Sequence, residues 1–312
     1  MDAISCAAKA LGQKLPNTEI KIDEPLKKHT SFKIGGPVRL MLFPACADDL
    51  VESFKVLSES GITPYIIGNG SNILAVDSAL DIVVINTSKL NGIGLVDFDV
   101  VGKQTHSFIT AEAGALLSKL AVYAYENELT GLEFAHGIPG TLGGAVVMNA
   151  GAYSGEMKDV VIETTAFDIS AGLYTLTAQE HEFAYRHSRF SDTGDVVLSS
   201  VIRLEKGDKI SIKQKMDELS VRRRESQPLD LPSGGSTFKR PAEGYASAMI
   251  EQSGLKGYTV GGAQVSQKHS GFIVNRGDAT FADTMAVIEH VQEVVLRQFG
   301  VELELEVKVI HS

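Results

Sequence analysis

The residues with the clearest chemical potential lie in a glycine-rich segment at residues 131–155, GLEFAHGIPGTLGGAVVMNAGAYSG, in which seven of 25 positions are glycine. Glycine lets the main chain approach a ligand closely, although it loses more conformational entropy on folding than any other residue. Polar turn residues are scarce, and the apolar members favour burial: Ile138, Pro139, Leu142, Ala145, Val146, Val147 and Met148. We therefore favour bare backbone lying against a large, flat, anionic cofactor over a run of tight turns.

A shorter glycine loop follows a predicted strand and consists of Gly68, Asn69, Gly70, Ser71 and Asn72. It does not match the dinucleotide pattern GxGxxG, because position 73 is isoleucine and no clear helix is predicted before the next strand. Free amides beside short polar side chains still suit a pyrophosphate, and a plain turn is an equally good interpretation.

Two other loops carry polar side chains that could act on a ligand. The first, HEFAYRHSRF at residues 181–190, concentrates Tyr185, Arg186, His187 and Arg189, although a solvated loop would look the same. In the second, LPSGGSTFKRP at residues 231–241, two glycines precede Ser236 and could expose its hydroxyl, although serine in such loops is usually a turn residue.

Metal and disulfide chemistry are not indicated by the sequence. Cys6 and Cys46 are the only cysteines, they form no CxxC motif, and the eight histidines include no HExxH. We therefore predict no metal site.

Composition excludes several classes of function. The 312 residues are 44% hydrophobic and 22% charged, as in an ordinary folded protein of two or three domains. A net charge of −10 argues against general nucleic-acid binding, which depends on neutralising phosphates. No run has the length of a membrane span and the N-terminus lacks a secretory pattern, so we expect a cytoplasmic protein with no nucleic-acid or membrane partner.

The elements that must position these residues alternate in the first third of the chain, which indicates an α/β beginning. A mainly polar helical lead-in and an irregular stretch at residues 20–29 precede a buried strand at Val38–Phe43. A helix is predicted at Asp48–Ser60, and strands follow at residues 63–68 and from Ile82.

The middle of the chain is predicted to be α+β. Strands are expected at residues 107–114, 160–169, 172–178 and 196–207. A helix after the first of them carries apolar Leu117, Leu120, Ala121 and Ala124 and ends near Gly131, and a second helix, Lys209–Glu225, has Ile212, Met216 and Leu219 on one side.

The C-terminal part contains a strand-like pair, GGAQVSQKHSGFIVN at residues 261–275, which carries Lys268 and His269. The last helix is expected to begin near Thr280 with Asp283 as its capping-box partner and to end at Gly300, burying Met285, Ile288, Val291, Val295 and Phe299. Residues 301–310, VELELEVKVI, alternate like a strand, and periodicity does not single out Glu302, Glu304 or Glu306 for catalysis.

Seven motifs in this order resemble those of the UDP-N-acetylenolpyruvoylglucosamine reductases, flavoenzymes that complete UDP-N-acetylmuramate for peptidoglycan. The motifs are HTSFKIGGP, GNGSN, GLEFAHGIPGTLGGAVVMNAGAY, AYRHSRF, PSGGSTFKRP, GGAQVSQKHSGFIVN and FGVELELEV. The resemblance runs from about Leu26 to Ile310, and the forms AYRHSRF and GSTFKRP are similar to the second type of the family.

The resemblance implies an α+β (α/β) flavoprotein. It consists of an FAD-binding fold of the vanillyl-alcohol-oxidase type in two subdomains, residues 1–88 and 89–206, and a C-terminal α+β domain for the UDP-sugar, residues 207–312. By this likeness GNGSN holds the FAD pyrophosphate and residues 137–145 lie along the flavin. The implied cofactor contacts are Gly68, Asn69, Gly70, Ser71, Asn72, Gly137, Ile138, Pro139, Gly140, Thr141, Gly143, Gly144, Ala145 and Asn149.

The implied reaction adds hydride from flavin N5 to the methylene carbon of an enolpyruvyl ether and leaves negative charge between the α-carbon and the carboxylate. Arg186 matches the family's arginine and would stabilise that charge. Glu306 matches the family's acid, and beside a carboxylate it must keep its proton, which requires a raised pKa in a buried, apolar setting. Ser236 matches the family's serine and would deliver a proton to the α-carbon.

Substrate contacts are implied in the same way. Tyr153, Tyr185, Arg223, Lys239 and His269 match positions that contact the UDP-sugar of UDP-N-acetylglucosamine enolpyruvate, where cationic and aromatic groups suit diphosphate and uracil. NADPH would use the same cleft first and then leave. The alternatives are a flavin oxidase of the same fold and a non-catalytic UDP-sugar-binding regulator.

The chain departs from the family pattern at four positions, none of which is a catalytic group: His136, Ser154, Gly234 and Leu305. Ser154 stands where glycine is usual after AGAY and could reshape the turn beside Tyr153.

Overall fold

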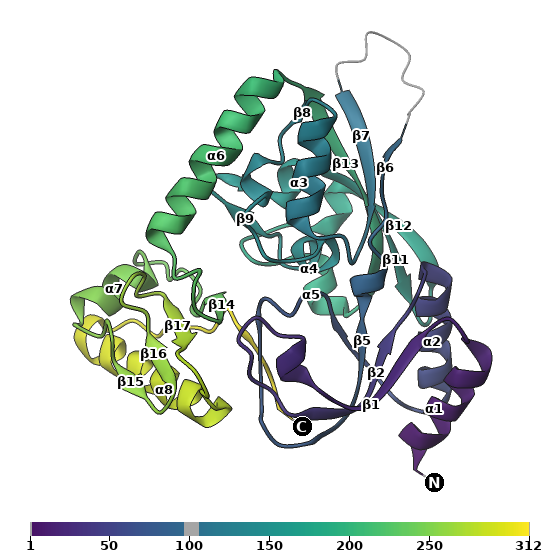
Figure 1. The fold of residues 1–312 in the computed structure, drawn as a ribbon, viewed down its shortest axis with the longest axis horizontal. Helices are drawn as coiled ribbons and strands as arrows, with labels where there is room; N and C mark the ends of the chain where they lie inside the picture. The colour runs from purple at the N-terminus through teal and green to yellow at the C-terminus, as the bar shows by residue number, and fades with distance from the viewer. Residues whose placement is uncertain (1, 97–105, 312) are drawn as a thin grey trace. The chain divides into compact units, whose positions relative to one another are not determined.

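The computed structural model describes residues 2–96 and 106–311, and the chain forms two compact units (Figure 1). The first unit consists of Met1–Lys21, Leu40–Asn69 and Val83–Arg222. The second consists of Ile22–Arg39, Gly70–Ile82 and Arg223–Ser312. Each unit is therefore built from segments that lie far apart in the sequence. The division into three domains at residues 88 and 206 stays a prediction.

A six-stranded antiparallel sheet forms the centre of the first unit, in the order β12-β11-β13-β7-β6, with β8 also paired to β13. Its strands are β6 (Ile93–Val96), β7 (His106–Glu112), β8 (Leu129–Thr130), β11 (Val161–Asp168), β12 (Gly172–Thr177) and β13 (Val196–Lys206). The helices α3 (Leu117–Glu126) and α4 (Leu142–Val147) share one hydrophobic core with this sheet, and Figure 1 shows α3 beside β7.

Helix α3 confirms the periodicity of its sequence, because the four apolar residues expected to face the core are buried: Leu117, Leu120, Ala121 and Ala124. The helix nevertheless ends at Glu126, before the expected end near Gly131. Glu128 has a φ of 58°, which a right-handed helix does not allow, and the next two residues pair with β13 as β8.

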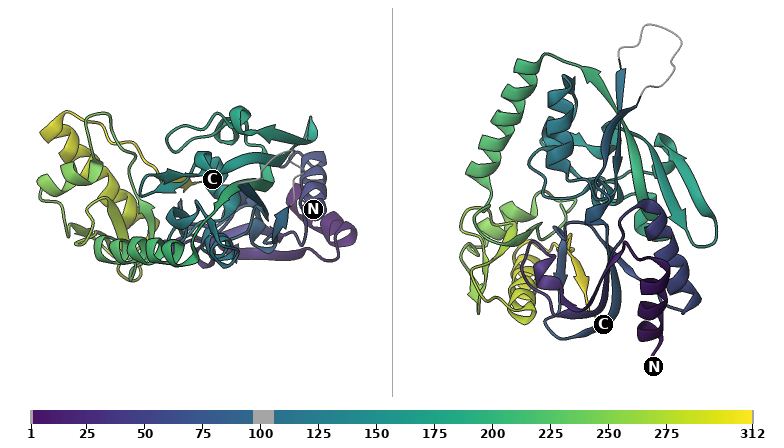
Figure 2. Two further views of the ribbon diagram at one scale, coloured as in Figure 1. Left: turned by 90° about the horizontal axis from the view of Figure 1, so that it is seen from above. Right: turned by 45° about the vertical axis from the view of Figure 1, so that its right-hand side comes forward.

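A second core of the first unit joins α1 (Ala3–Lys14) and α2 (Ala47–Glu59) to the parts of a sheet of order β1-β2-β5-β3 that belong to this unit, which include Leu40, Leu42, Val83 and Ile85. These strands are β1 (Glu19–Pro25), β2 (Pro37–Phe43), β5 (Leu80–Asn86) and β3 (Tyr65–Ile67). Figure 2 shows α1 and α2 side by side near the N-terminus. The expected strands β2, β3 and β5 are confirmed, whereas the irregular stretch predicted at residues 20–29 is wrong, because most of it forms β1.

The second unit contains an antiparallel sheet of order β14-β17-β16-β15 and two helices. The elements are β14 (Ser233–Ser236), α7 (Ala246–Gln252), β15 (Thr259–Val260), β16 (Ala263–Val265), β17 (Phe272–Asn275) and α8 (Phe281–Phe299). A short parallel pair, β4 (Ile73–Ala75) with β18 (Lys308–Ile310), belongs to the same unit.

The helices of the C-terminal third largely confirm the sequence pattern. Helix α6 (Lys209–Ser226) buries Ile212, Met216 and Leu219 as expected. Helix α8 has the expected capping box, in which Thr280 Oγ1 accepts from Asp283 N–H at 3.0 Å, and it ends at Gly300 with a φ of 68°. Burial of Phe299 was a wrong prediction, because this residue of the last turn is 38% exposed.

Two further expectations for the second unit are wrong in detail. Residues 231–241 do not form only a loop, because β14 pairs with β17 inside this stretch. The regular strand expected over residues 301–310 is limited to β18, and before it only an isolated bridge joins Leu305 to Phe238. Among the described residues, no helix has the length and apolar character needed to cross a membrane.

Candidate functional site

The glycine-rich segment has one packed side and one open side in the first unit. Leu142, Ala145 and Val146 are buried in the core around α4, whereas Gly137, Pro139 and Gly144 are exposed. Gly143 is close to the chain beneath it, since an added Cβ would lie 2.9 Å from Ala113 Cβ. The segment therefore presents small residues and main chain on its open side, as the sequence predicts.

The end of β3 lies directly against this segment. A Cβ added to Gly68 would lie 2.1 Å from Thr141 Oγ1, and Asn69 Nδ2 donates to Pro139 O at 2.6 Å. The two stretches that the sequence connected with one cofactor therefore meet within the first unit.

The polar groups at this meeting point fit a flavin nucleotide. Counting partners only within residues 2–96 and 106–311, the amides of Gly68, Gly137 and Gly140 have none, and neither does the buried Thr141 Oγ1. Buried polar groups are almost always hydrogen-bonded, so the buried Thr141 Oγ1 is suited to an external acceptor such as a phosphate or a flavin carbonyl. The three amides are reached by solvent and are available to donate to the same kind of group.

We expect Gly68→Ala to weaken FAD binding by at least about tenfold, because the new methyl group cannot lie 2.1 Å from Thr141 Oγ1 without moving the loop. The measurement is an FAD titration of apoprotein followed by flavin fluorescence. Gly12→Ala in α1 is the control, since its Cβ would meet no atom within 4 Å and should leave FAD affinity unchanged. Equal FAD affinity of Gly68→Ala and the unaltered chain would contradict this view of the loop.

Asn149 is fully buried, and its side chain bonds protein atoms. Its Nδ2 donates to Glu156 Oε2 at 2.9 Å and to Ala184 O at 3.0 Å, and its Oδ1 accepts from Lys158 N–H at 3.0 Å. The side chain thus joins the end of the glycine-rich segment to the turn that carries Arg186. Its expected contact with the cofactor stays a prediction.

Tyr185 and Arg186 occupy the centre of a tight turn that is closed by hydrogen bonds between Ala184 and His187 in both directions. Arg186 has a φ of 53°, a conformation unusual for a residue with a side chain, and its Nη2 donates to Gly151 O at 3.3 Å. Backbone strain of this kind is typical of functional sites. Tyr185 is 47% exposed, and the Arg186 guanidinium carbon lies 5.1 Å from the centre of its ring.

A buried histidine anchors the chain that leads to this turn. His181 has its Nδ1 2.8 Å from Thr177 O and its Nε2 2.7 Å from Thr164 Oγ1, and its ring stacks on Phe183. Because a carbonyl oxygen only accepts, Nδ1 carries the proton in the neutral ring and Nε2 accepts from Thr164. Burial lowers the pKa of His181, which favours this neutral form. Sequence reasoning missed this residue, because a lone histidine has no distinguishing pattern.

Acidification should therefore destabilise the protein through His181. The unfolded chain takes up a proton near pH 6.5 and the folded chain only at lower pH, so this contribution is complete above about pH 6.5 and is lost as pH falls below it. We expect the melting temperature to fall less between pH 7.5 and 5.5 in His181→Gln than in the unaltered chain. The measurement is calorimetry at fixed FAD concentration, and equal falls in both proteins would show that His181 does not titrate in this way.

Tyr153 and Ser154 form the turn between β9 (Gly151–Ala152) and β10 (Gly155–Glu156), and their φ angles are 53° and 73°. The two-residue turns preferred in hairpins require positive φ, which glycine adopts more easily than tyrosine or serine. The buried Tyr153 hydroxyl has no hydrogen-bond partner in the described part of the chain, and the ring lies 5.1 Å from the Arg222 guanidinium carbon. A donor aimed this way is suited to a ligand oxygen.

Ser154→Gly should raise the free energy of unfolding by about 0.5–1 kcal/mol, because relief of left-handed strain exceeds the entropy that glycine loses. Chemical denaturation measures this difference. Ser60→Gly is the comparison, since Ser60 has a φ of −92° and no strain to relieve. Destabilisation in both variants would mean that the serine turn is not strained.

The second unit brings the end of β14, which carries Ser236, next to the extended chain around Glu306. Glu306 N–H donates to Thr237 O at 2.9 Å, directly after Ser236, and both side chains are half-buried. Within the described residues the Ser236 hydroxyl has no hydrogen-bond partner. The expected acid and the expected proton donor therefore lie in one place, which alternation along residues 301–310 could not reveal.

The rest of the GNGSN loop belongs to the second unit and contacts the main chain of Glu306 and Lys308. Asn72 Nδ2 donates to Glu306 O at 3.0 Å, and Asn72 O accepts from Lys308 N–H at 2.9 Å. Gly70 has a φ of 59°, and Ser71 is half-buried. Asn72 thus holds the main chain of Glu306, and the expected pyrophosphate contacts of this loop stay predictions.

Three of the expected substrate contacts lie in the second unit and already have protein partners. Lys239 Nζ pairs with Glu304 at 2.9 Å on the surface, a pair that stabilises little and can be exchanged for a phosphate. His269 Nδ1 accepts from Gly271 N–H at 3.2 Å, and burial lowers its pKa, so Nε2 is the ring donor. Arg223 Nε donates to Gln227 at 2.9 Å.

The site residues thus form two groups. The first unit holds Gly68, Asn69, residues 137–149, Tyr153, Tyr185 and Arg186, and the second holds Gly70, Ser71, Asn72, Arg223, Ser236, Lys239, His269 and Glu306. Over the residues that the structure describes, no group of three or more histidine, cysteine or acidic side chains could hold a metal ion, and Cys6 and Cys46 form no disulfide bond.

Comparison with known families accounts for both parts of the chain. A model described as an FAD binding domain matches residues 38–176, and a model of the UDP-N-acetylenolpyruvoylglucosamine reductase C-terminal domain matches residues 227–310. The expected α+β architecture, with an FAD-binding part followed by a C-terminal domain, is confirmed, and FAD is the cofactor.

Relatives match over nearly the whole chain. UDP-N-acetylenolpyruvoylglucosamine reductase of Caldanaerobacter subterraneus is 48% identical over 300 residues, covering 96% of both chains, and that of Agathobacter rectalis is 46% identical over 312 residues, covering 97% of both. The crystal structure of the Thermus caldophilus enzyme is 31% identical with a TM-score of 0.76, covering 94% of this chain and 98% of that one. The chain belongs to the family of UDP-N-acetylenolpyruvoylglucosamine reductases.

Proposed function

We propose that this chain reduces the enolpyruvyl group of UDP-N-acetylglucosamine enolpyruvate to give UDP-N-acetylmuramate, with NADPH as the source of hydride. The observation that supports this most strongly is the presence, in one chain, of an FAD binding domain at residues 38–176 and the reductase C-terminal domain at residues 227–310. Bound FAD supplies a two-electron carrier that can accept hydride from a nicotinamide and pass it to a carbon. Since both reactants are soluble nucleotides of the cytoplasm, we place the reaction there.

The role of Arg186 in this proposal is electrostatic. Hydride addition to the methylene carbon leaves negative charge on the α-carbon and the carboxylate, and a guanidinium beside it stabilises the transition state more than the neutral ground state. The turn that carries Arg186 is closed at Ala184 and His187 and held by Asn149, so the guanidinium needs little reorganisation.

Ser236 and Glu306 complete the reaction. The Ser236 hydroxyl donates a proton to the α-carbon, a step that a weak acid can perform because a carbanion is a strong base. Glu306 binds the enolpyruvyl carboxylate in its protonated form, since two carboxylates at hydrogen-bond distance do not both ionise. Their common position supports this assignment, because Glu306 N–H bonds the residue after Ser236.

Binding of the UDP-sugar is assigned to residues with aromatic or cationic groups: Tyr153, Tyr185, Arg223, Lys239 and His269. Arg223 and Lys239 suit the diphosphate, His269 offers an Nε2 donor, and Tyr153 and Tyr185 offer hydroxyls.

The decisive experiment is a two-stage spectrum of the purified holoenzyme. We expect a flavin absorption band that bleaches when NADPH is added without oxygen and returns when UDP-N-acetylglucosamine enolpyruvate follows, with UDP-N-acetylmuramate as product. Bleaching by a simple alcohol or hydroxy acid with rapid oxygen consumption would indicate a flavin oxidase instead. Binding of the UDP-sugar with neither phase would indicate a regulator.

A further inference from the structure

The motif HTSFKIGGP at residues 29–37 has no role in the proposed reaction. Its serine nevertheless contacts two segments of the second unit that the proposed function uses. Ser31 N–H donates to Gly70 O at 3.1 Å, and Ser31 Oγ donates to Ser233 O at 2.6 Å. Gly70 belongs to the GNGSN loop, and Ser233 begins β14 three residues before Ser236. One residue therefore joins the loop to the strand of the proton donor.

The loop lies on the backbone of this motif without space between them. A Cβ added to Gly70 would lie 2.0 Å from His29 O and 2.9 Å from Thr30 Cα. Ser31 Oγ is also 3.4 Å from Gly70 O, but a hydroxyl has one proton, and the shorter contact to Ser233 O takes it. The amide of Ser31 thus binds the loop and its hydroxyl binds β14.

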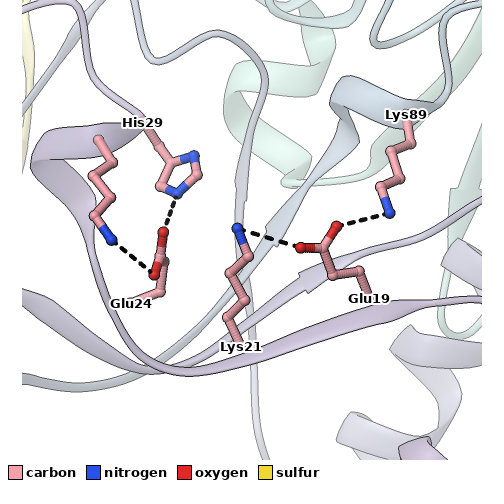
Figure 3. Close-up of polar contacts among 6 residues, drawn as sticks. Glu19, Lys21, Glu24, His29 and Lys89 are labelled. Carbon is pink, nitrogen blue, oxygen red and sulfur yellow. Dashed lines mark hydrogen bonds and ion pairs between the residues drawn. The ribbon is translucent and has the colours of Figure 1, made fainter.

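The motif is itself held in place on its N-terminal side. His29 Nε2 lies 2.9 Å from Glu24 Oε1, and Lys28 Nζ lies 3.5 Å from the other oxygen of this buried carboxylate. Figure 3 shows the His29 ring pointing toward Glu24. Thr30 Oγ1 donates to Ile34 O at 3.0 Å and closes the turn around Ser31. Ser31 therefore acts from a fixed support.

The next residue of the motif contacts β14 as well. Phe32 is 1% exposed, and a Cβ on Gly234 would lie 2.6 Å from its ring. Asn275 Nδ2 in the neighbouring strand β17 donates to Phe32 O at 3.0 Å. The first two residues of β14 are thus held by two successive residues of the motif.

The orientation of Ser236 depends on this support because β14 contains a bulge. Ser233 pairs with Val274 and Ser236 with Phe272, so three steps along β14 match two along β17, and Gly235 has a φ of 80°. A bulge redirects the side chains that follow it. A shift of Ser233 therefore changes where the Ser236 hydroxyl points.

We propose that Ser31 is a positioning residue for Ser236, which it places by fixing the start of β14 against the loop of Gly70. The proposed reaction assigns Ser31 no part in binding or in the chemical steps, and in this inference it acts through β14. The inference rests on the proposed function, in which Ser236 donates the proton.

The kinetic test separates the two half-reactions by stopped flow. In Ser31→Ala we expect recolouring of the reduced flavin by UDP-N-acetylglucosamine enolpyruvate to slow about 10- to 100-fold, because a misplaced donor loses its alignment, while bleaching by NADPH changes less than about twofold. Ser31→Thr keeps the hydroxyl and should recover most of the rate. Thr284→Val is the control, since it also removes a hydroxyl that donates to a backbone carbonyl of the same unit, at 3.0 Å, and should leave both phases unchanged.

A double-mutant cycle shows whether Ser31 acts through Ser236. If it does, adding Ser31→Ala to Ser236→Ala should slow recolouring no further. If the double variant is slower than Ser236→Ala by the same factor that Ser31→Ala causes alone, the two residues act independently and the inference is overturned. If Ser31→Ala recolours as fast as the unaltered enzyme while Ser236→Ala recolours slowly, the inference about Ser31 is overturned and the proposed function is unaffected. Normal recolouring of Ser236→Ala would remove the proton-donor assignment and the inference with it.

Hydrogen exchange gives a readout that does not depend on activity. Ser31→Ala should speed amide exchange in the peptides that contain Gly70 and Ser233–Thr237 but not in α7. Thr284→Val should speed exchange in α8 and leave the peptides of Gly70 and Ser233–Thr237 unchanged. Unchanged exchange at β14 in Ser31→Ala would overturn the inference whatever the kinetics show.

Discussion

Ser236→Ala will slow the return of flavin colour by about 10²- to 10⁴-fold and leave bleaching by NADPH nearly unchanged, because general acid catalysis by a positioned group contributes in this range. Protonation of the α-carbon belongs only to the second half-reaction. The half-buried hydroxyl has no hydrogen-bond partner among the described residues, so no protein bond is lost in the variant. Single-turnover stopped flow at 450 nm or thereabouts, where flavins absorb, measures both phases.

Ser233→Ala is the matched control for this result. It removes a half-buried hydroxyl from the same strand, three residues away, and leaves the carbonyl that binds Ser31 in place. We expect both of its phases to stay within about twofold of the unaltered enzyme. If Ser236→Ala behaved like Ser233→Ala, another group would have to deliver the proton.

Arg186→Gln should slow the second half-reaction by about 10²- to 10³-fold, the loss typical when one stabilising group is removed from a developing negative charge. The rate of Arg186→Lys should fall between those of Arg186→Gln and the unaltered enzyme, because lysine keeps the charge but lacks the planar pair of donors that matches a carboxylate. The turn should keep its shape in both variants, since its closure depends on the backbone of Ala184 and His187. The measurement is the recolouring rate at saturating substrate, together with substrate affinity from flavin fluorescence.

Arg189→Gln provides the comparison in the same stretch of chain. Arg189 begins α5 (Arg189–Thr193), is half-buried, and carries the same charge three residues further on. General loss of positive charge would slow both variants alike, whereas a specific role predicts a large effect only at Arg186. Equal rates in Arg186→Gln and Arg189→Gln would therefore remove Arg186 from the reaction.

Local sequence pattern was enough to predict the longer helices α2, α3, α6 and α8 and the exposed main chain of the glycine-rich segment. Helix α3 buries Leu117, Leu120, Ala121 and Ala124, and α8 has its capping box, because helical periodicity and capping arise from residues three or four positions apart. The glycine-rich segment could also be recognised from the sequence, because a main chain that approaches another main chain or a ligand closely requires glycine. The motifs identified the family because their order and spacing are properties of the chain.

How the segments that carry Ser236 and Glu306 meet follows from the packed fold and could not be predicted from the sequence. The sequence pattern did not predict β1 or the bulged strand β14. Each strand pairs with a segment far along the chain, and their polar and glycine residues have weak strand propensity. The alternation of residues 301–310 could not distinguish Glu306 from Glu302 or Glu304. Its position next to Ser236 comes from hydrogen bonds with Thr237 and Asn72, which lie 69 and 234 residues away, and pairing over such distances is set by the packed fold and leaves no local pattern.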